Sequence, residues 1–284
     1  MNYWYSLARW GLAVALLGGV AGARPAAAQT RRAVYGLQVW PELQAELALK
    51  NGDYFLLALR GQRDVEQPGY VGDGRRLGFD ERRVTLGYEH FWNEHWSGGG
   101  TARLEALGNN RLVLVPEALI RHRSSLGPLR FGQRLGLERT FPNNAGYTGG
   151  SGPDGQTWAR LRVDLEKVLP LGGGKLALRP RLSYEAATRL RLLRADTDEQ
   201  ERTVQFTSLR GELGVRLNDW FDLTPWVAYQ TRYAFTIEQT DAMGRVTIPA
   251  GRFNQVVPVL GLDARVTLFQ GKAAFERQQL PTQH

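Results

Sequence analysis

Arginines recur at alternate positions in many stretches of this chain, and glutamates and aspartates stand among them. A guanidinium group holds a carboxylate or a phosphate through two parallel hydrogen bonds, so such rows can form ion-pair ladders or anion sites. The arginines that we predict to line one interior surface are Arg83, Arg103, Arg121, Arg123, Arg134, Arg160, Arg162, Arg179, Arg181, Arg210, Arg216 and Arg265. The carboxylates predicted among them are Glu105, Glu138, Asp164, Glu166, Glu185, Glu212 and Asp263.

His122 and Ser124 are the best candidates for covalent catalysis, because a neighbouring histidine can take the proton of a serine hydroxyl. The pair resembles the His-x-Ser motif of the outer-membrane phospholipase family, and that resemblance implies lipid hydrolysis. The glycine- and asparagine-bearing motif of that family is absent here. We also expect Ser124 in a short periplasmic turn, whereas those enzymes act at the outer leaflet. We therefore predict no enzymatic activity, and lipid hydrolysis is our third hypothesis.

His90 and His95 flank Trp92, but no third metal ligand of matching type lies nearby in the sequence. The chain has no cysteine, which excludes a thiolate metal site and a disulfide framework. The glycines at 172–174 indicate a turn, since they are not followed by the lysine–hydroxyl pair and helix of a phosphate-binding loop. We predict neither a metal site nor a cofactor.

The elements that would position the charged residues have a period of two. In residues 256–268 the apolar side chains from Val256 to Leu268 share one face, and Asp263 and Arg265 lie on the other. This alternation is typical of a strand with one apolar and one polar face. Ten further segments repeat it, at residues 36–49, 53–63, 80–92, 96–107, 111–123, 129–141, 157–169, 175–186, 203–217 and 222–236.

Most of these eleven segments are ten to sixteen residues long. Strands of soluble proteins usually have about five or six residues, whereas a tilted membrane strand needs about nine to eleven. We therefore predict an all-β fold, an antiparallel transmembrane β-barrel of about 12 strands (10–12). Bacterial single-chain barrels normally have an even number of strands. Either residues 31–39 or the tail after Gln270 supplies a twelfth strand, or one of the segments is wrongly divided or joined.

The connections support this prediction, because outer-membrane barrels alternate short periplasmic turns with longer external loops. Short turns are expected at 51–52, 93–95, 124–127, 171–174 and 218–219, and long loops at 64–79, 142–156, 190–202 and 237–252, with a tight external link at 108–110. Trp92 and Trp96 flank one short turn and Trp220 and Phe221 another, as expected of an aromatic girdle at a membrane interface.

Residues 1–28 have the layout of a cleavable secretory signal. Arg9 precedes an apolar run from Trp10 to Ala23, and Ala26 to Ala28 form a small-residue cleavage site. The uncharged run between Arg9 and Arg24 has 14 residues, too few to cross a bilayer as a helix. We predict that residues 29–284 form one domain in the outer membrane.

Removal of the signal takes away two of the 36 basic residues and none of the 28 acidic ones, which leaves a net charge of 34 − 28 = +6. Basic proteins often bind nucleic acid. Here the arginines are spread along alternating strands and do not form a block, so we predict no nucleic-acid partner.

Four stretches resemble a family of Gram-negative outer-membrane barrels catalogued only as a domain of unknown function: Arg83 to Trp96, Pro116 to Phe141, Arg160 to Glu185 and Asn254 to Phe269. The resemblance covers residues 36–269, and its motifs are arginines and glutamates that alternate with leucine and tyrosine. The family tends to end at an aromatic residue that closes the last strand, whereas fifteen residues follow Phe269 here. The resemblance implies the barrel fold and supplies no activity.

Our first functional hypothesis is a structural or passive pore protein with a cationic lumen, since rings of arginine line anion-passing pores. The second is a binder of an anionic ligand such as lipid A phosphate or an acidic glycan. The expected partners are outer-membrane lipids and lipopolysaccharide, the barrel-assembly machinery and an anionic small solute. A soluble periplasmic β-protein is the alternative from a different class.

Overall fold

In a computed structural model, the structure describes residues 31–66, 78–107, 111–143, 155–171, 176–191, 203–236, 239–240, 243, 245–248 and 251–270. The predicted signal peptide, the turn at 172–174, the link at 108–110 and the tail after Gln270 lie outside these residues. So do most of the predicted loops 64–79, 142–156 and 190–202 and part of the loop 237–252. Within them every regular element is a β-strand, and no helix is long and apolar enough to cross a membrane.

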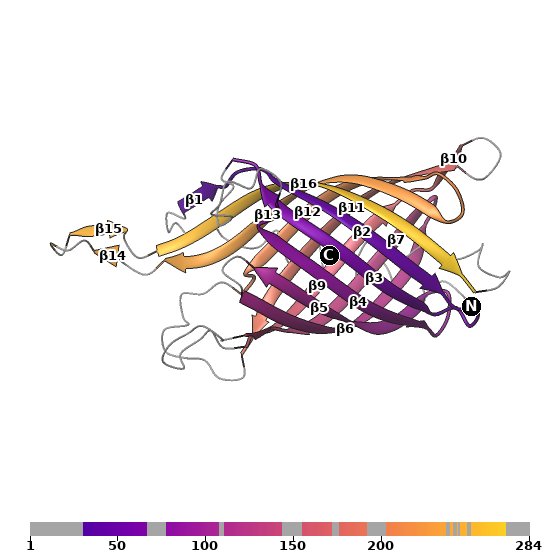
Figure 1. The fold of residues 1–284 in the computed structure, drawn as a ribbon, viewed down its shortest axis with the longest axis horizontal. Helices are drawn as coiled ribbons and strands as arrows, with labels where there is room; N and C mark the ends of the chain where they lie inside the picture. Colours follow the sequence, from indigo (N-terminus) through magenta and orange to yellow (C-terminus); the bar gives the residue numbers. More distant parts are fainter. Residues whose placement is uncertain are drawn as a thin grey trace, which may run out of the picture. The chain divides into compact units, whose positions relative to one another are not determined.

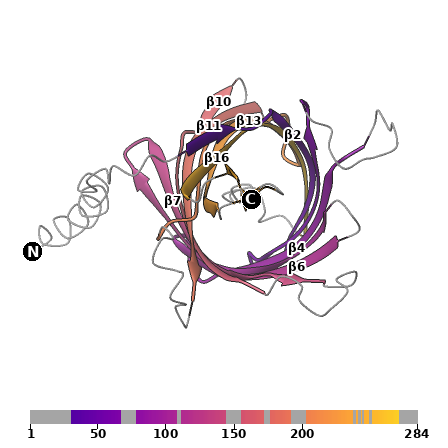
Figure 2. The same ribbon diagram turned by 90° about the vertical axis from the view of Figure 1, so that its left-hand side faces the viewer.

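Across this part of the chain, eleven strands close into one barrel (Figures 1 and 2). They are β2 (Gln38–Ala48), β3 (Tyr54–Asp64), β4 (Glu81–Phe91), β5 (Trp96–Leu107), β6 (Arg111–Leu126), β7 (Leu129–Arg139), β9 (Thr157–Glu166), β11 (Leu176–Leu190), β12 (Phe206–Arg216), β13 (Phe221–Thr236) and β16 (Gly251–Phe269). Shorter strands accompany them: β1 (Arg31–Val34), β8 (Phe141–Pro142), β10 (Leu169–Leu171), β14 (Gln239–Thr240) and β15 (Val246–Ile248). Each barrel strand corresponds to one alternating segment, and the predicted all-β barrel is confirmed.

The barrel closes between its first and last strands. Consecutive strands pair antiparallel, so with eleven of them β2 and β16 run in the same direction and pair in parallel, with Ala45 opposite Val266. Residues 31–34 do not form a separate twelfth strand of the barrel. Instead β1 continues the line of β2 along β16, with Val34 opposite Val256. One extra residue bulges between the two registers, because Gln38 pairs with Val259.

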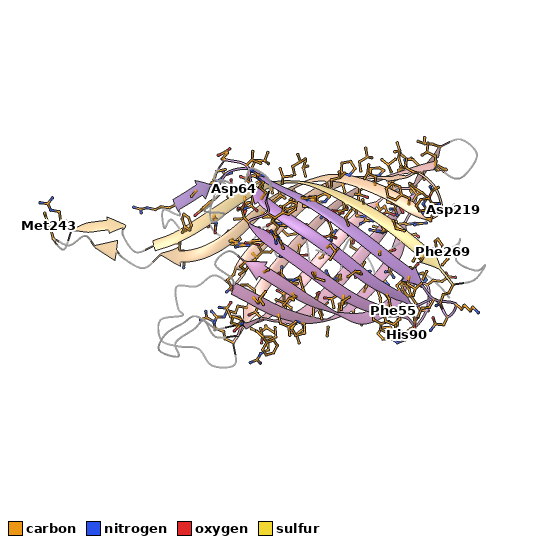
Figure 3. All side chains as sticks on the ribbon, viewed as in Figure 1. Phe55, Asp64, His90, Asp219, Met243 and Phe269 are labelled. Atoms are coloured by element: carbon orange, nitrogen blue, oxygen red, sulfur yellow. The ribbon has the colours of Figure 1, made fainter. Side chains whose placement is uncertain are left out.

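The two rims of the barrel differ. Phe55, His90, Asp219 and Phe269 mark the rim where the short connections lie, and Asp64 lies towards the other rim, where the longer connections begin (Figure 3). We call these the turn rim and the loop rim. Gly52 at the turn rim has a φ of 103°, which only glycine adopts without strain, as expected of the Asn51–Gly52 turn.

One predicted turn lies further along the chain than expected. Strand β6 runs on to Leu126, which pairs with Leu129, so Ser124 belongs to the strand. The reversal takes place at Gly127, whose φ is 60°. The alternation continues through Ser124 and Ser125, and only glycine supplies the left-handed backbone that the turn needs.

Side-chain burial is the reverse of that in a soluble protein. Large apolar residues cover the outer surface, and Leu43, Val227 and Leu86 are 63%, 59% and 57% exposed. Charged residues fill the inside, where Glu46, Glu89 and Arg121 are at most 2% exposed. The period-two pattern thus has its polar phase inside the barrel, as predicted for a lumen wall.

Candidate functional site: an arginine-lined cavity inside the barrel

The half of the lumen near the turn rim is packed with ion pairs. Glu89 on β4 accepts hydrogen bonds from Arg121 and Arg123 on β6, at 2.9 and 3.1 Å, and from the hydroxyl of Ser97. All four side chains are nearly sealed from water, which a buried carboxylate tolerates only when its charge is matched. Here the arginines match it.

Similar pairs surround the rest of this half. They are Glu117–Arg134 at 2.6 Å, Asp222–Arg179 at 3.2 Å, Glu46–Arg265 at 3.4 Å and Glu166–Arg181. Arg216, at the end of β12, lies 3.9 Å from Asp222 and is more exposed. Asp164 packs against Gly132, where an added Cβ would come within 2.5 Å of the carboxylate. Most charged side chains of the turn half are therefore paired and shielded from water.

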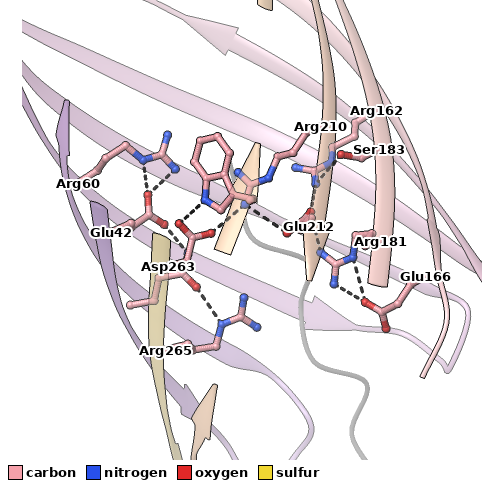
Figure 4. A network of polar contacts seen from close by, with 12 residues as sticks. Glu42, Arg60, Arg162, Glu166, Arg181, Ser183, Arg210, Glu212, Asp263 and Arg265 are labelled. Atoms are coloured by element: carbon pink, nitrogen blue, oxygen red, sulfur yellow. Dashed lines mark hydrogen bonds and ion pairs between the residues drawn. The ribbon is translucent and has the colours of Figure 1, made fainter. Parts of the chain in front are cut away.

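A second network crosses the middle of the barrel wall (Figure 4). Asp263 on β16 accepts hydrogen bonds from Arg210 at 2.9 Å and from the indole N–H of Trp226 at 2.8 Å. Glu212 beside it pairs with Arg162 at 3.3 Å and with Arg181 at 3.5 Å. Next to this network, Arg60 pairs with Glu42.

Nearer the loop rim the ladder becomes partly exposed. Arg83 and Arg103 both bond Glu105 at 2.8 Å. Arg160 bonds Glu138 and Glu185, each at 2.8 Å, and Arg103 also reaches Glu138 at 3.1 Å. The arginine side chains of this ladder are 14–23% exposed, in contrast to Arg121 at 2%. Solvent thus reaches the ladder in this half of the lumen.

A cavity of about 610 Å³ lies between this ladder and an aromatic wall. The wall is a buried apolar cluster on β2, β13 and β16, in which Trp40 and Trp226 meet edge to face at 6.0 Å between ring centroids. The guanidinium of Arg210 lies 3.7 Å from the Trp226 ring, and that of Arg60 lies 5.4 Å from the Trp40 ring. An added Cβ at Gly261 would collide with Trp226, so this glycine makes room for the indole.

Eight arginines and three glutamates line the cavity. The arginines are Arg60, Arg83, Arg103, Arg160, Arg162, Arg189, Arg210 and Arg232, and the glutamates are Glu105, Glu138 and Glu185. From the wall, Glu42, Glu212 and Asp263 pair with Arg60, Arg162 and Arg210, and Glu81 lies close enough to interact with Arg83 and Arg232. Among the described residues, eight positive charges therefore face seven negative ones. Arg189 has no ion pair with a residue that the structure describes. The described side chains around the cavity thus carry one more positive than negative charge.

The predicted site residues therefore separate into two groups. Five of the predicted arginines line the cavity, and the other seven lie in the turn half of the lumen. The alternation also assigns Arg60 and Arg232 to the lumen wall, but it did not identify Arg189 or the aromatic residues of the cavity. The sequence does carry a signal for these aromatic residues. Tryptophan occurs at positions 40, 158 and 226, where the alternation of each strand calls for an inward polar residue, so the rings are expected inside the barrel.

The histidines among the catalytic and metal candidates contact neighbouring side chains and backbone. The His122 ring packs on Trp96 at 4.5 Å, while His95 contacts the carbonyl oxygen of Arg123 at 3.1 Å and His90 bonds Asp53 at 2.9 Å. In the described part of the chain, no three histidine or acidic side chains come together as metal ligands.

Asp53 organises the turn between β2 and β3. Its carboxylate accepts hydrogen bonds from the Tyr88 hydroxyl at 2.6 Å, the Asn51 amide at 2.8 Å and the Phe91 N–H at 3.3 Å, beside the His90 contact. Burial alone would raise the pKa of Asp53, but the hydrogen bonds to its ionised form outweigh that effect, so the pKa lies below the ordinary value of an aspartate. The carboxylate is structural.

Comparison with protein-family models, with curated proteins and with solved structures finds no match to this chain.

Proposed function

We propose that this chain is an outer-membrane β-barrel that binds an anionic solute in a cavity open towards its loop rim. The observation that carries the proposal is the difference between the two halves of the lumen. Charged side chains in the turn half are sealed by their partners, whereas arginines in the loop half line a cavity with surplus positive charge. A cationic cavity lined by aromatic and polar side chains is typical of a binding site.

The membrane location rests on the outer surface. Exposed leucine, valine and tyrosine cover the barrel wall, and a contiguous apolar surface of this extent is unfavourable in water. Closed barrels satisfy all their backbone hydrogen bonds internally, which is the requirement in lipid. The chain expressed with its leader should be recovered in the outer-membrane fraction and resist extraction with urea. Recovery of the mature chain in solution without detergent would instead indicate a soluble periplasmic protein.

Binding can be tested with pyrophosphate, a small anion. The barrel reconstituted in lipid nanodiscs should bind it saturably in calorimetry. Arg189→Gln should weaken this binding about tenfold, because it removes a cavity charge and breaks no ion pair with a described residue. Lys50→Gln, at the turn rim, is the matched control and should leave the affinity unchanged. A wild-type barrel without measurable affinity for pyrophosphate or for a carboxylate would contradict the proposal.

A passive pore is the second candidate, and one observation favours it. The ion pairs described above join strands that are neighbours or one strand apart, so they run along the wall. Planar-bilayer recording separates the two functions. A binding barrel should give a silent bilayer, and discrete anion-selective conductance steps would favour the pore.

A further inference from the structure

Aromatic and arginine side chains alternate across four neighbouring strands at the loop-rim end of the cavity. Trp158 on β9 is directly opposite Arg189 on β11, and Phe206 on β12 is directly opposite Arg232 on β13. Ala187, two residues before Arg189, pairs with Phe206, so the two pairs lie side by side. All four of these larger side chains line the cavity. We call Trp158, Arg189, Phe206 and Arg232 the mouth cluster.

The mouth cluster is open where the deeper aromatic wall is not. Trp226 and Trp40 are buried, and Arg210 and Arg60 lie over their rings. Trp158 and Phe206 are only half-buried, and Arg160 lies over Phe206 at 5.2 Å. The mouth cluster therefore offers partly accessible aromatic surface beside the guanidinium of Arg189, which has no ion pair with a described residue.

This combination selects for a particular kind of anion. An arginine binds phosphate, sulfate and carboxylate alike, and so it fixes the charge of a ligand but not its shape. An aromatic ring adds affinity only for a ligand with a flat apolar face of its own. The small surplus of positive charge among the described residues favours a ligand with few negative groups over a highly charged polyanion, and the volume fits a small molecule.

We infer that the mouth cluster recognises a carboxylate carried on a ring, with the ring stacked on Trp158 or Phe206 and the carboxylate bound by Arg189 or Arg232. This inference rests on the proposed anion-binding function and names its ligand class. The same chemistry has two sources, an acidic sugar and an aromatic acid. Trigalacturonate represents the first source and 1-naphthoate the second, and the neutral galactotriose tests the need for charge.

The experiment measures the affinity of the barrel in nanodiscs for these probes and for pyrophosphate. We expect one or both ring carboxylates to bind and galactotriose not to bind. Trp158→Leu should lower the ring-carboxylate affinity about tenfold or more and leave the pyrophosphate affinity unchanged, because only the stacking surface is lost. Trp158→Phe should retain most of the affinity. Trp220→Leu, at the turn rim, is the aromatic control.

Folding of every variant is checked by its heat-modifiable mobility in gels, and Phe206→Leu serves as a second test if Trp158→Leu does not fold. Equal ring-carboxylate affinities in wild type, Trp158→Leu and Phe206→Leu would overturn the inference. Binding of pyrophosphate without binding of either ring carboxylate would also overturn it and leave the proposed function standing. Failure of all the anions to bind would reject both. The relative affinities for trigalacturonate and 1-naphthoate identify the source.

Discussion

Glu89 illustrates what a carboxylate requires in the sealed half of this barrel. Its side chain is buried, and it is held by two arginines and a serine from neighbouring strands. The favourable charge interaction offsets the cost of removing all three charges from water. Loss of one member therefore leaves the others buried without compensation.

We predict that Glu89→Gln destabilises the barrel by about 3–5 kcal/mol, because Arg121 and Arg123 then remain buried without their counter-charge. Urea titration of the barrel in phospholipid vesicles measures the free energy of unfolding. Glu94→Gln is the control, since Glu94 is exposed in the adjacent turn. Equal stability of the two variants would contradict the ladder as a source of stability.

Asp53 gives a prediction about pH. Its pKa is lowered in the folded barrel, so the ionised carboxylate stabilises the fold at pH values above about 3.9, its pKa in an unfolded chain. That contribution is lost as the pH falls through the lower folded pKa. Asp53→Asn should therefore have a lower free energy of unfolding than wild type at neutral pH. The difference between the two free energies should shrink as the pH falls through the lowered pKa of Asp53. A difference that stays constant down to the most acidic pH measured would show that the charge is not responsible.

At the scale of elements, period-two alternation was sufficient to predict all eleven barrel strands. Each strand has one face in the polar interior and one on the apolar surface, so local sequence determines it. The closure was not predictable in this way. β2 and β16 pair across more than two hundred residues, and no local pattern distinguishes a parallel closing pair from a missing twelfth strand.

The cavity was also only partly predictable. Alternation assigns arginines to the interior, but it does not give their height along the barrel axis. The height determines the surroundings of each arginine. Arg121 lies near the turn rim and is buried beside Glu89, whereas Arg160 lies nearer the loop rim and lines the cavity. The inward tryptophans were missed because an apolar side chain is assigned to the outer face, although their positions are in phase with the polar residues of their strands.

The parallel closure can be tested with engineered cysteines, since the chain has none of its own. Ala45 and Val266 are directly opposite each other on β2 and β16. Ala45→Cys combined with Val266→Cys should form a disulfide and change the mobility of the unreduced chain in gels. Ala45→Cys with Ala264→Cys is the control, because a two-residue offset separates the Cα atoms by about 8 Å. Cross-linking of the control alone would show a different register.

At the scale of the whole molecule, the odd number of strands sets the two ends of the barrel apart. β1 begins at the loop rim and β16 ends at the turn rim. A barrel with an even number of consecutive antiparallel strands would bring both ends to one rim.

This arrangement predicts the pattern of labelling in intact cells, given the proposed outer-membrane location with the short turns in the periplasm. Val34→Cys should react from outside with a bulky polyethylene glycol maleimide that cannot cross the membrane, because Val34 is 62% exposed near the loop rim. Asn51→Cys, exposed in a short turn, should react only after lysis. Labelling of Asn51→Cys alone in intact cells would place the barrel the other way up.

The odd number of strands also determines on which side of the membrane a domain fused to either end of the barrel would lie. In the proposed orientation, a domain fused ahead of Arg31 would face the medium, whereas one fused behind Phe269 would face the periplasm. The barrel would then link a domain outside the cell covalently to a domain in the periplasm, whether or not any solute passes through the barrel.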